Sequence, residues 1–307
     1  MPVQEDVLET RDVAETPCTR RAIYHTAENG FAFAWPAVRV HQFLAERDLA
    51  FDGKTPMGDI LLDISGDLGT PYPATTPTLL LRYLKIRAGE RLRTAFAASG
   101  EVYYVMRGKG QSRNGADCIA WGQGDVFCFP GGGETAHLAN SGDCLLFVAT
   151  NEPLLAFERL RPPLPGQAVT ETAHWVAERI ERGLQAVWQR PITENTTGAS
   201  VQFTSTALQP STNTVPSINT AINTLEAGRD QRPHRHNGVA VTLAIQGEGI
   251  YSMVGGQRVD WSDGAAQITP ATALHSHHNR GGKRMRSFVV QDEGLHQYTR
   301  TPGFSFG

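Results

Sequence analysis

Short apolar runs bounded by turn residues dominate the chain between about residues 76 and 160. They lie at residues 79–81, 101–106, 124–130 and 145–148, and glycines or prolines punctuate them. Runs of this length and spacing are typical of β-strands joined by hairpins. The pattern predicts a first antiparallel β-barrel in this region.

A second β pattern follows residue 200, where Leu243 and Ile245 alternate with their neighbours before the turn at Gly247. Alternation with a period of two predicts strands with one buried face. We expect the apolar side chains of this region to lie inside a second barrel, where they suit a flat ring as well as an ordinary core. These are Leu243, Ile245, Met253, Trp261 and Ile268, and Trp261 is taken as a candidate substrate-binding residue.

Between the two β regions the periodicity changes. Val176, Ile180, Leu184 and Val187 recur every three or four residues before Pro191. This spacing predicts an amphipathic helix near residues 170–190 that packs on a barrel or on a second subunit. Residues 1–75 have no clean period, although residues 38–49 could form a short helix.

The two β regions resemble each other. Residues 101–110 match 241–249, and residues 124–130 match 264–270, in their turn glycines, their proline and the strands between. We infer an internal duplication and an all-β fold of two barrels with a few helices. The predicted domains are an N-terminal extension (1–75), a first barrel (76–160), a linker with a helix (161–199) and a second barrel (200–307).

Composition narrows the function classes. The 307 residues carry a formal net charge of −3 without long blocks of one sign, which gives no support for nucleic acid or membrane as a partner. No apolar stretch approaches the roughly 20 residues that cross a bilayer. Residues 1–15 are polar and acidic, and the four cysteines lack metal-type spacing. We therefore expect a cytoplasmic protein with reduced thiols.

The most informative motif is a pair of histidines, His234 and His236, followed downstream by His275. Residues at positions i and i+2 of a strand project to the same face, and a neighbouring strand can add the third imidazole. Three neutral nitrogen ligands hold a divalent metal and leave coordination positions open for substrate. The sequence predicts one metal ion per chain, bound by these three histidines.

The first barrel lacks this pair, because the matching segment is residues 93–98, which offers no ligand. Glu101 and His137 remain where an acidic ligand and the third histidine would lie. Two candidates without the pair make a weak site. We predict that the first barrel is metal-free, and that Glu101 and His137 are a retained polar pair or surface groups.

The predicted metal site has no carboxylate, since Ala240 and Val241 occupy the place where a glutamate could follow the histidines. Two or three open positions can then admit a chelating substrate and dioxygen together. Such a site suits an iron(II)-dependent, extradiol-type dioxygenase that cleaves a hydroxylated aromatic ring. Iron(II) and dioxygen are therefore the expected cofactor and co-substrate.

The glycine, histidine and proline spacing around these ligands resembles the two-part motif of the cupin superfamily, whose domain is a jelly-roll barrel. In more detail, residues 215–295 resemble bicupins of the gentisate 1,2-dioxygenase type, including relatives that act on salicylates and hydroxynaphthoates. The resemblance implies that His234, His236 and His275 hold iron. It also implies that His277 moves protons near the reacting oxygens and that Asn279 holds a turn.

Two positions depart from that family. Thr242 stands where family members carry an arginine that grips the substrate carboxylate, and Asn223 stands where they often carry glutamine. Both are candidate substrate-binding residues. The family also usually places iron in its first barrel. Either the substrate lacks that carboxylate, or another arginine reaches the site, the candidates being Arg229, Arg258, Arg284 and Arg286.

Proteins with other functions could use the same three histidines. A metal-dependent isomerase, a diketone or thiol dioxygenase, and a non-catalytic sensor are the alternatives. The apolar face of the 170–190 helix and the resemblance to bicupins lead us to expect a homodimer or homotetramer.

Overall fold

The computed structural model describes residues 15–27, 30, 32, 35–140, 142–190 and 198–307. Residues 37–307 form one compact unit, and residues 1–36 form another. The described part of the smaller unit contains a 3-10 turn, η1 (Thr19–Arg21). Most of the polar N-terminal segment considered above, residues 1–14, lies outside the described residues.

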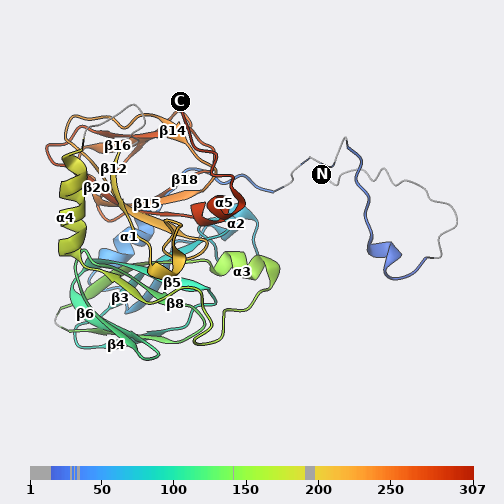
Figure 1. Ribbon diagram of the computed structural model, residues 1–307, viewed down its shortest axis with the longest axis horizontal. Coiled ribbons are helices and arrows are strands. Elements are labelled where there is room, and N and C mark those ends of the chain that lie inside the picture. Colours follow the sequence, from blue (N-terminus) through green and yellow to red (C-terminus); the bar gives the residue numbers. More distant parts are fainter. Residues whose placement is uncertain (1–14, 28–29, 31, 33–34, 141, 191–197) are drawn as a thin grey trace. The chain divides into compact units, whose positions relative to one another are not determined.

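The large unit contains two antiparallel β-barrels, each made of two sheets (Figure 1). The first barrel has a six-stranded sheet and a four-stranded sheet. In spatial order the six strands are β11 (Ala173–Trp175), β8 (Val126–Pro130), β5 (Gly100–Arg107), β10 (Cys144–Thr150), β3 (Leu80–Ile86) and β2 (Gly58–Leu61). The four strands are β4 (Arg91–Thr94), β9 (Thr135–Ala139), β6 (Lys109–Asn114) and β7 (Asp117–Gly122).

The second barrel repeats this plan with a six-stranded and a five-stranded sheet. The six strands are β1 (His41–Gln42), β18 (Ala266–Thr269), β15 (Ala240–Gln246), β20 (Met285–Gln291), β13 (Asn219–Leu225) and β12 (Ala199–Gln202). The five are β17 (Gln257–Asp260), β16 (Ile250–Val254), β19 (His275–Asn279), β14 (His234–Arg235) and β21 (Ser305–Phe306). The predicted fold class, two barrels with a few helices, is confirmed.

The helices are short and lie at the barrel edges. They are α1 (Leu44–Phe51), α2 (Ser65–Leu68), α3 (Glu152–Glu158), α4 (Ala177–Trp188), η2 (Thr206–Leu208) and α5 (Glu293–Thr299). The helix predicted near residues 170–190 is α4, which begins only at Ala177 because Ala173–Trp175 form strand β11. It buries Ile180 and Leu184 and packs against β12 of the second barrel (Figure 1). Pro191, the expected stop, lies outside the described residues. None of the described helices is long and apolar enough to cross a membrane.

The two six-stranded sheets pack face to face and share one apolar core. Tyr104 of the first barrel stacks on Phe288 of the second, with ring centroids 5.2 Å apart. The Tyr83 hydroxyl donates a hydrogen bond to the carbonyl oxygen of Gly264 across the same boundary, at 2.7 Å. The barrels are therefore joined through their cores rather than through a flexible linker.

This packing corrects the predicted facing of the second barrel's apolar residues. Leu243, Ile245 and Ile268 lie in or against the shared core between the barrels, not inside the second barrel. Because strand side chains alternate, the neighbouring residues Ala240 and Thr242 face the interior instead. Met253 alternates with the buried Ser252 and faces outward.

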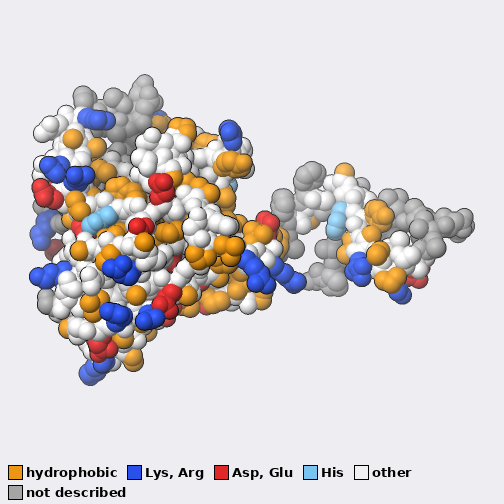
Figure 2. Space-filling view, turned by 60° about the horizontal axis from the view of Figure 1, so that its bottom comes forward, with side chains coloured by type: hydrophobic (Ala, Val, Ile, Leu, Met, Phe, Trp, Pro, Cys, Tyr) orange, Lys and Arg blue, Asp and Glu red, His pale blue; other side chains and the backbone are white. Residues whose placement is uncertain are grey.

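On the face of the large unit seen in Figure 2, basic and acidic side chains are interspersed. Among the described side chains, this face has no broad basic area of the kind that follows a nucleic-acid backbone.

Candidate metal centre

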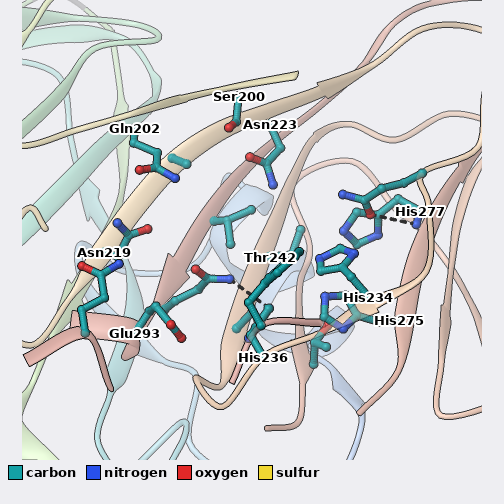
Figure 3. Close-up of a pocket in the computed structure, with 18 residues that line it drawn as sticks. Ser200, Gln202, Asn219, Asn223, His234, His236, Thr242, His275, His277 and Glu293 are labelled. Atoms are coloured by element: carbon teal, nitrogen blue, oxygen red, sulfur yellow. Dashed lines mark hydrogen bonds between the residues drawn. The ribbon is translucent and has the colours of Figure 1, made fainter. Parts of the chain in front are cut away.

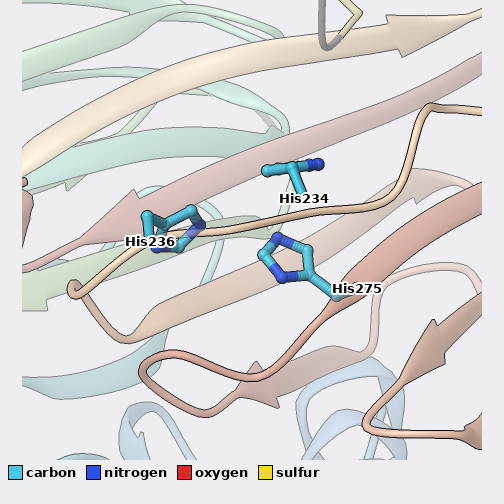
Figure 4. Close-up of side chains that lie close together, drawn as sticks. All are labelled: His234, His236 and His275. Carbon is cyan, nitrogen blue, oxygen red and sulfur yellow. The ribbon is translucent and has the colours of Figure 1, made fainter. Parts of the chain in front are cut away.

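Three buried histidines converge inside the second barrel (Figure 4). His234 lies on β14 and is paired across the sheet with His275, the first residue of β19. His236 follows two positions after His234 and returns to the same side. One nitrogen from each ring can be chosen so that all three atoms lie within 4.8 Å of one another. Within the described part of the chain, no other group of three His, Cys, Asp or Glu side chains meets this condition.

The backbone fixes the orientation of all three rings. The Nδ1 of His234 lies 3.1 Å from the carbonyl oxygen of Arg232 and that of His236 lies 2.8 Å from the carbonyl of Gly238. The Nδ1 of His275 lies 2.9 Å from the carbonyl of Ala273. A carbonyl can only accept, so each Nδ1 carries the proton and each Nε2 is an unprotonated nitrogen with a lone pair. This is the arrangement by which proteins orient histidine ligands toward a metal.

The three imidazoles are also neutral at physiological pH. Burial, with a contribution from neighbouring imidazoles, lowers the pKa of His236 to about 4 and that of His275 to about 3. Burial likewise lowers the pKa of His234. A histidine must be unprotonated to bind a metal, so the donor set is ready for a divalent cation without losing protons first.

The donor set fits a divalent transition metal with open coordination positions. Three imidazole nitrogens suit zinc, copper, iron or nickel, whereas magnesium and calcium prefer oxygen ligands. Ala240 stands where a carboxylate ligand would enter, and its methyl group cannot bind. The Nε2 of His236 is 3.3 Å from the amide nitrogen of Gln291, which shows that its lone pair faces the barrel interior.

The histidines open onto a pocket of about 210 Å³ (Figure 3). For comparison, an enclosed cavity of about 150 Å³ holds benzene. Fourteen of the eighteen lining residues have polar side chains, so the pocket can form directional contacts with a substituted ring. The lining residues other than the three histidines are Ser200, Gln202, Asn219, Ala221, Asn223, Gln231, Ala240, Thr242, Thr269, His277, Val289, Gln291, Glu293, Gln297 and Phe304.

The pocket exists because small and polar residues replace large ones at matching positions. Thr242 is paired with Val289 as Tyr103 of the first barrel is paired with Val148. In the first barrel Tyr103 is fully buried and stacks on Phe127 with centroids 4.7 Å apart. The first barrel is therefore filled with aromatic side chains, whereas the second is hollow.

The strand pairing also corrects the matching of the first barrel's polar residues. Thr94 is paired with Thr135 as His234 is paired with His275, so a threonine stands at the position of the third histidine. His137 instead corresponds to His277, because each is paired with a serine on the next strand. The predicted place of His137 was therefore wrong by two residues: Thr135, not His137, takes the place of the third histidine. Both residues face the same side of strand β9, because side chains two positions apart share a face.

Glu101 and His137 are not surface groups. Both are fully buried, and the Glu101 carboxyl accepts hydrogen bonds from Tyr103 at 2.6 Å and Thr135 at 2.9 Å. Burial raises the pKa of Glu101 to about 7. His137 is bonded to Ser112 at 2.8 Å and to Thr94 at 3.2 Å. Each of the two side chains is thus bonded to neighbouring polar groups of the first barrel.

His277 lines the pocket in a defined protonation state. Ser252 Oγ accepts hydrogen bonds from the Trp261 indole at 2.7 Å and from the Gln267 amide at 2.8 Å. Both lone pairs are then used, so the serine hydroxyl donates to His277 Nδ1, 2.9 Å away. The proton of the neutral His277 ring must therefore lie on Nε2, which makes this atom a hydrogen-bond donor.

The other predicted residues divide into two groups. Asn223 and Thr242 line the pocket as expected. Trp261 does not line it: the indole lies behind His277, with ring centroids 5.3 Å apart, and supports Ser252. Asn279 holds a turn through its bonds to the Leu225 and Lys283 carbonyls and from the Gly281 amide.

None of the four candidate arginines lines the pocket. Arg258 is bound to Asp260 on the surface, and Arg284 and Arg286 are paired with Glu226 and Glu181 beside Trp188. Arg229 is exposed. Across the described lining there is no lysine or arginine, and Glu293 is its one carboxylate.

Comparison with known proteins agrees with this geometry. Residues 221–291 match the model of the cupin domain. The matched segment lies within the second barrel. An 81-residue segment, 26% of this chain, is 36% identical to the 5-aminosalicylate 1,2-dioxygenase of a Comamonas species, and spans 22% of that relative's length.

The whole fold has relatives among solved structures. Salicylate 1,2-dioxygenase from Pseudaminobacter salicylatoxidans superposes with a TM-score of 0.73 at 13% identity over 89% of both chains. Its gentisate adduct gives a TM-score of 0.76 at 14% identity over 98% of this chain and 97% of that chain. A cupin 2 conserved barrel protein from Leptotrichia buccalis gives 0.51 at 11% identity, over 82% and 97%. At these identities the comparison shows the fold, and the segment that matches the cupin domain model contains the three histidines.

Three of the pocket residues that sequence reasoning missed lie late in the chain. Gln291 ends β20, Glu293 begins α5, and Phe304 precedes the short strand β21. None belongs to a recognisable motif, and each lies more than ten residues after the last histidine ligand. Only the alignment of Gln291 with Asn219 across the β20–β13 pair could have indicated a polar interior at that end.

Proposed function

We propose that this protein is a metal-dependent dioxygenase that cleaves a small hydroxylated aromatic ring. The observation that carries the proposal is the set of three neutral imidazoles, each with an unprotonated Nε2, at the wall of a ring-sized pocket. The named relatives support the reaction class, since one is a 5-aminosalicylate and another a salicylate 1,2-dioxygenase.

His234, His236 and His275 would hold the metal, and iron(II) is the ion we propose. When bound, iron(II) supplies a redox centre through which an electron-rich phenolic ring and dioxygen exchange electrons. The absence of a carboxylate from the ligand set keeps the positive charge of the ion available to an anionic phenolate.

The remaining residues would orient the ring and control protons. His277 is placed to donate a hydrogen bond from Nε2 to an oxygen atom within the pocket. It is a donor rather than a base in its resting state, because Ser252 occupies Nδ1. Asn223 and Thr242 would position the ring from the opposite sheet. Phe304, whose ring centroid lies 5.6 Å from that of His234, would exclude water from one side of the pocket.

We also propose one metal per chain, in the second barrel, a cytoplasmic location and a homodimer or homotetramer. The filled interior of the first barrel supports a single site per chain. The domain boundaries near residues 75, 160 and 199 remain predictions. Within the predicted N-terminal extension, residues 41–42 pair with a strand of the second barrel and residues 58–61 pair with a strand of the first.

The test is oxygen uptake by protein loaded anaerobically with iron(II), offered gentisate, salicylate, 5-aminosalicylate, catechol and hydroquinone. His275→Ala should abolish uptake and reduce the iron content. His278→Ala is the matched control. His278 lies on the same strand as His275, but it is bonded to Asp230 at 2.7 Å and stacked on Tyr251. The proposal is supported if wild-type protein and His278→Ala take up oxygen with one class of ring and His275→Ala does not. Iron-loaded protein without uptake on any ring would contradict it and favour an isomerase, a diketone or thiol dioxygenase, or a sensor.

A further inference from the structure

The charges around the pocket are unusual for a site that handles anionic aromatic acids. Among the described residues the lining includes no lysine or arginine, and its one carboxylate is Glu293. Amide side chains fill the positions on either side, among them Gln202, Asn219 and Gln291. Amides can donate or accept a hydrogen bond, but they do not neutralise a negative charge as an arginine does.

Glu293 is held so that one oxygen remains available. Its Oε2 accepts a hydrogen bond from the Gly238 backbone amide at 3.1 Å, while Oε1 has no protein partner among the described residues. Gly238 in turn accepts from Nδ1 of His236 at 2.8 Å, so a short bonded path fixes the carboxyl relative to the metal site. Figure 3 shows Glu293 together with Asn219 and Gln202 on the side of the pocket away from His277.

Burial raises the pKa of Glu293 to about 7, and the charge of Asp292 adds to the effect. A nearby hydrogen-bond donor would favour the ionised form, whereas a second carboxylate would oppose it. The Gly238 backbone amide is already bound to Glu293, so it is not available to a substrate anion.

We propose that Glu293 is a specificity-determining residue, which accepts a hydrogen bond from an amino or hydroxyl substituent of the ring and disfavours a carboxylate there. The proposal rests on the proposed function in one respect, namely that the ring is held at the three-histidine site. It assigns a substrate class: hydroxylated aromatic rings with a neutral hydrogen-bond donor at the end remote from the metal.

The test is anaerobic equilibrium binding to iron(II)-loaded protein, measured by isothermal titration calorimetry. The pH is about 8, above the pKa of Glu293, so that its carboxylate is ionised. Two matched pairs of rings differ only in the remote group: 5-aminosalicylate against 5-carboxysalicylate, and 4-aminocatechol against 3,4-dihydroxybenzoate. Wild-type protein should favour the amino member of at least one pair by about tenfold or more, since like charges at close range cost several kcal/mol. In Glu293→Gln the preference should fall below about threefold on the same physical argument.

Gln202→Glu provides a second variant that does not depend on the folding of the first. Gln202 is exposed and lines the pocket, so an added carboxylate should increase the amino preference. Glu248→Gln, an exposed residue outside the pocket with the same change of charge, is the control and should leave the preference unchanged.

An unchanged preference in Glu293→Gln, or a wild-type protein that favours the carboxylate members, would overturn the inference. Oxygen uptake on the same rings separates this result from the proposed function. An amino preference lost in Glu293→Gln without any oxygen uptake would refute the dioxygenase and leave the selectivity of Glu293 standing.

Discussion

Replacing Glu101 by glutamine tests whether the first barrel is a closed polar core or a second metal site. Glu101 is fully buried, accepts hydrogen bonds from Tyr103 and Thr135 through Oε2, and has no partner for Oε1. A metal-binding carboxylate would be ionised and would have a lowered pKa. Glu101 instead has a pKa raised to about 7 by burial, so below about pH 7 it is held largely as the protonated acid.

The sign and size of the effect follow from this shift. The unfolded chain releases the Glu101 proton near pH 4.5, whereas the folded chain keeps it until about pH 7. Because the folded state binds more protons in this window, the free energy of unfolding falls as the pH rises. The loss approaches a value on the order of 3 kcal/mol above the folded pKa. Glutamine resembles the protonated acid and should be spared this loss.

The measurement is urea unfolding, followed by circular dichroism at about pH 5 and about pH 8. Glu101→Gln should gain on the order of 2 kcal/mol relative to wild type between the two conditions. Glu90→Gln, an exposed substitution in the same barrel, should show no comparable gain. If Glu101→Gln is destabilised more at the higher pH, then Glu101 is ionised in the folded protein and the account of a protonated polar core is wrong.

Three further predictions concern the pocket. Thr242→Arg should strengthen anaerobic binding of ring carboxylates by about tenfold or more, because charge-assisted hydrogen bonds contribute about 1.5–3 kcal/mol; an equal gain in Thr242→Gln would show that size, not charge, is responsible. Ser252→Ala should lower the free energy of unfolding by about 1–3 kcal/mol, because it removes the acceptor of two buried donors; unchanged thermal unfolding would contradict the bonding of His277 described above. Phe304→Ala should weaken ring binding about 2- to 10-fold through loss of aromatic contact without changing the iron content, and a loss of iron instead would mean that Phe304 supports His234.

The convergence of the histidines was predictable because its signal is local. His234 and His236 are separated by a single residue on an extended segment, so strand geometry alone places their side chains on the same side. The helix α4 was predictable for the same reason, since its apolar spacing repeats within twelve residues. In each case neighbouring residues in the sequence carry the whole pattern.

The interior of the second barrel was not predictable in this way. Both faces of β15 are covered, one by the pocket wall and one by the first barrel, so alternation alone could not decide where Leu243 points. Glu293 reaches the pocket from a helix start, where it is bonded to Gly238, 55 residues away in the sequence. Such positions depend on how the two barrels pack, and this packing is not reflected in a periodic pattern of the sequence.

The two barrels together indicate which features belong to the fold and which to the site. Trp121, Ser112 and His137 form the same hydrogen-bonded group as Trp261, Ser252 and His277, at the same spacings. Since the first barrel has this group without three converging histidines, the Trp–Ser–His group by itself is a structural element of the barrel.

What distinguishes the second barrel is what the histidine of this group faces. His137 Nε2 is bonded to Thr94, whereas the position of Thr94 is taken in the second barrel by His234. Emptying the interior, as in the exchange of Tyr103 for Thr242, then leaves His277 Nε2 directed at open space. Three ligands in a filled barrel would hold a metal that no ring could reach, and a hollow barrel without ligands would bind a ring without chemistry. The second barrel combines both changes, and this combination, rather than the histidine motif alone, is the strongest structural argument that it acts on a bound ring.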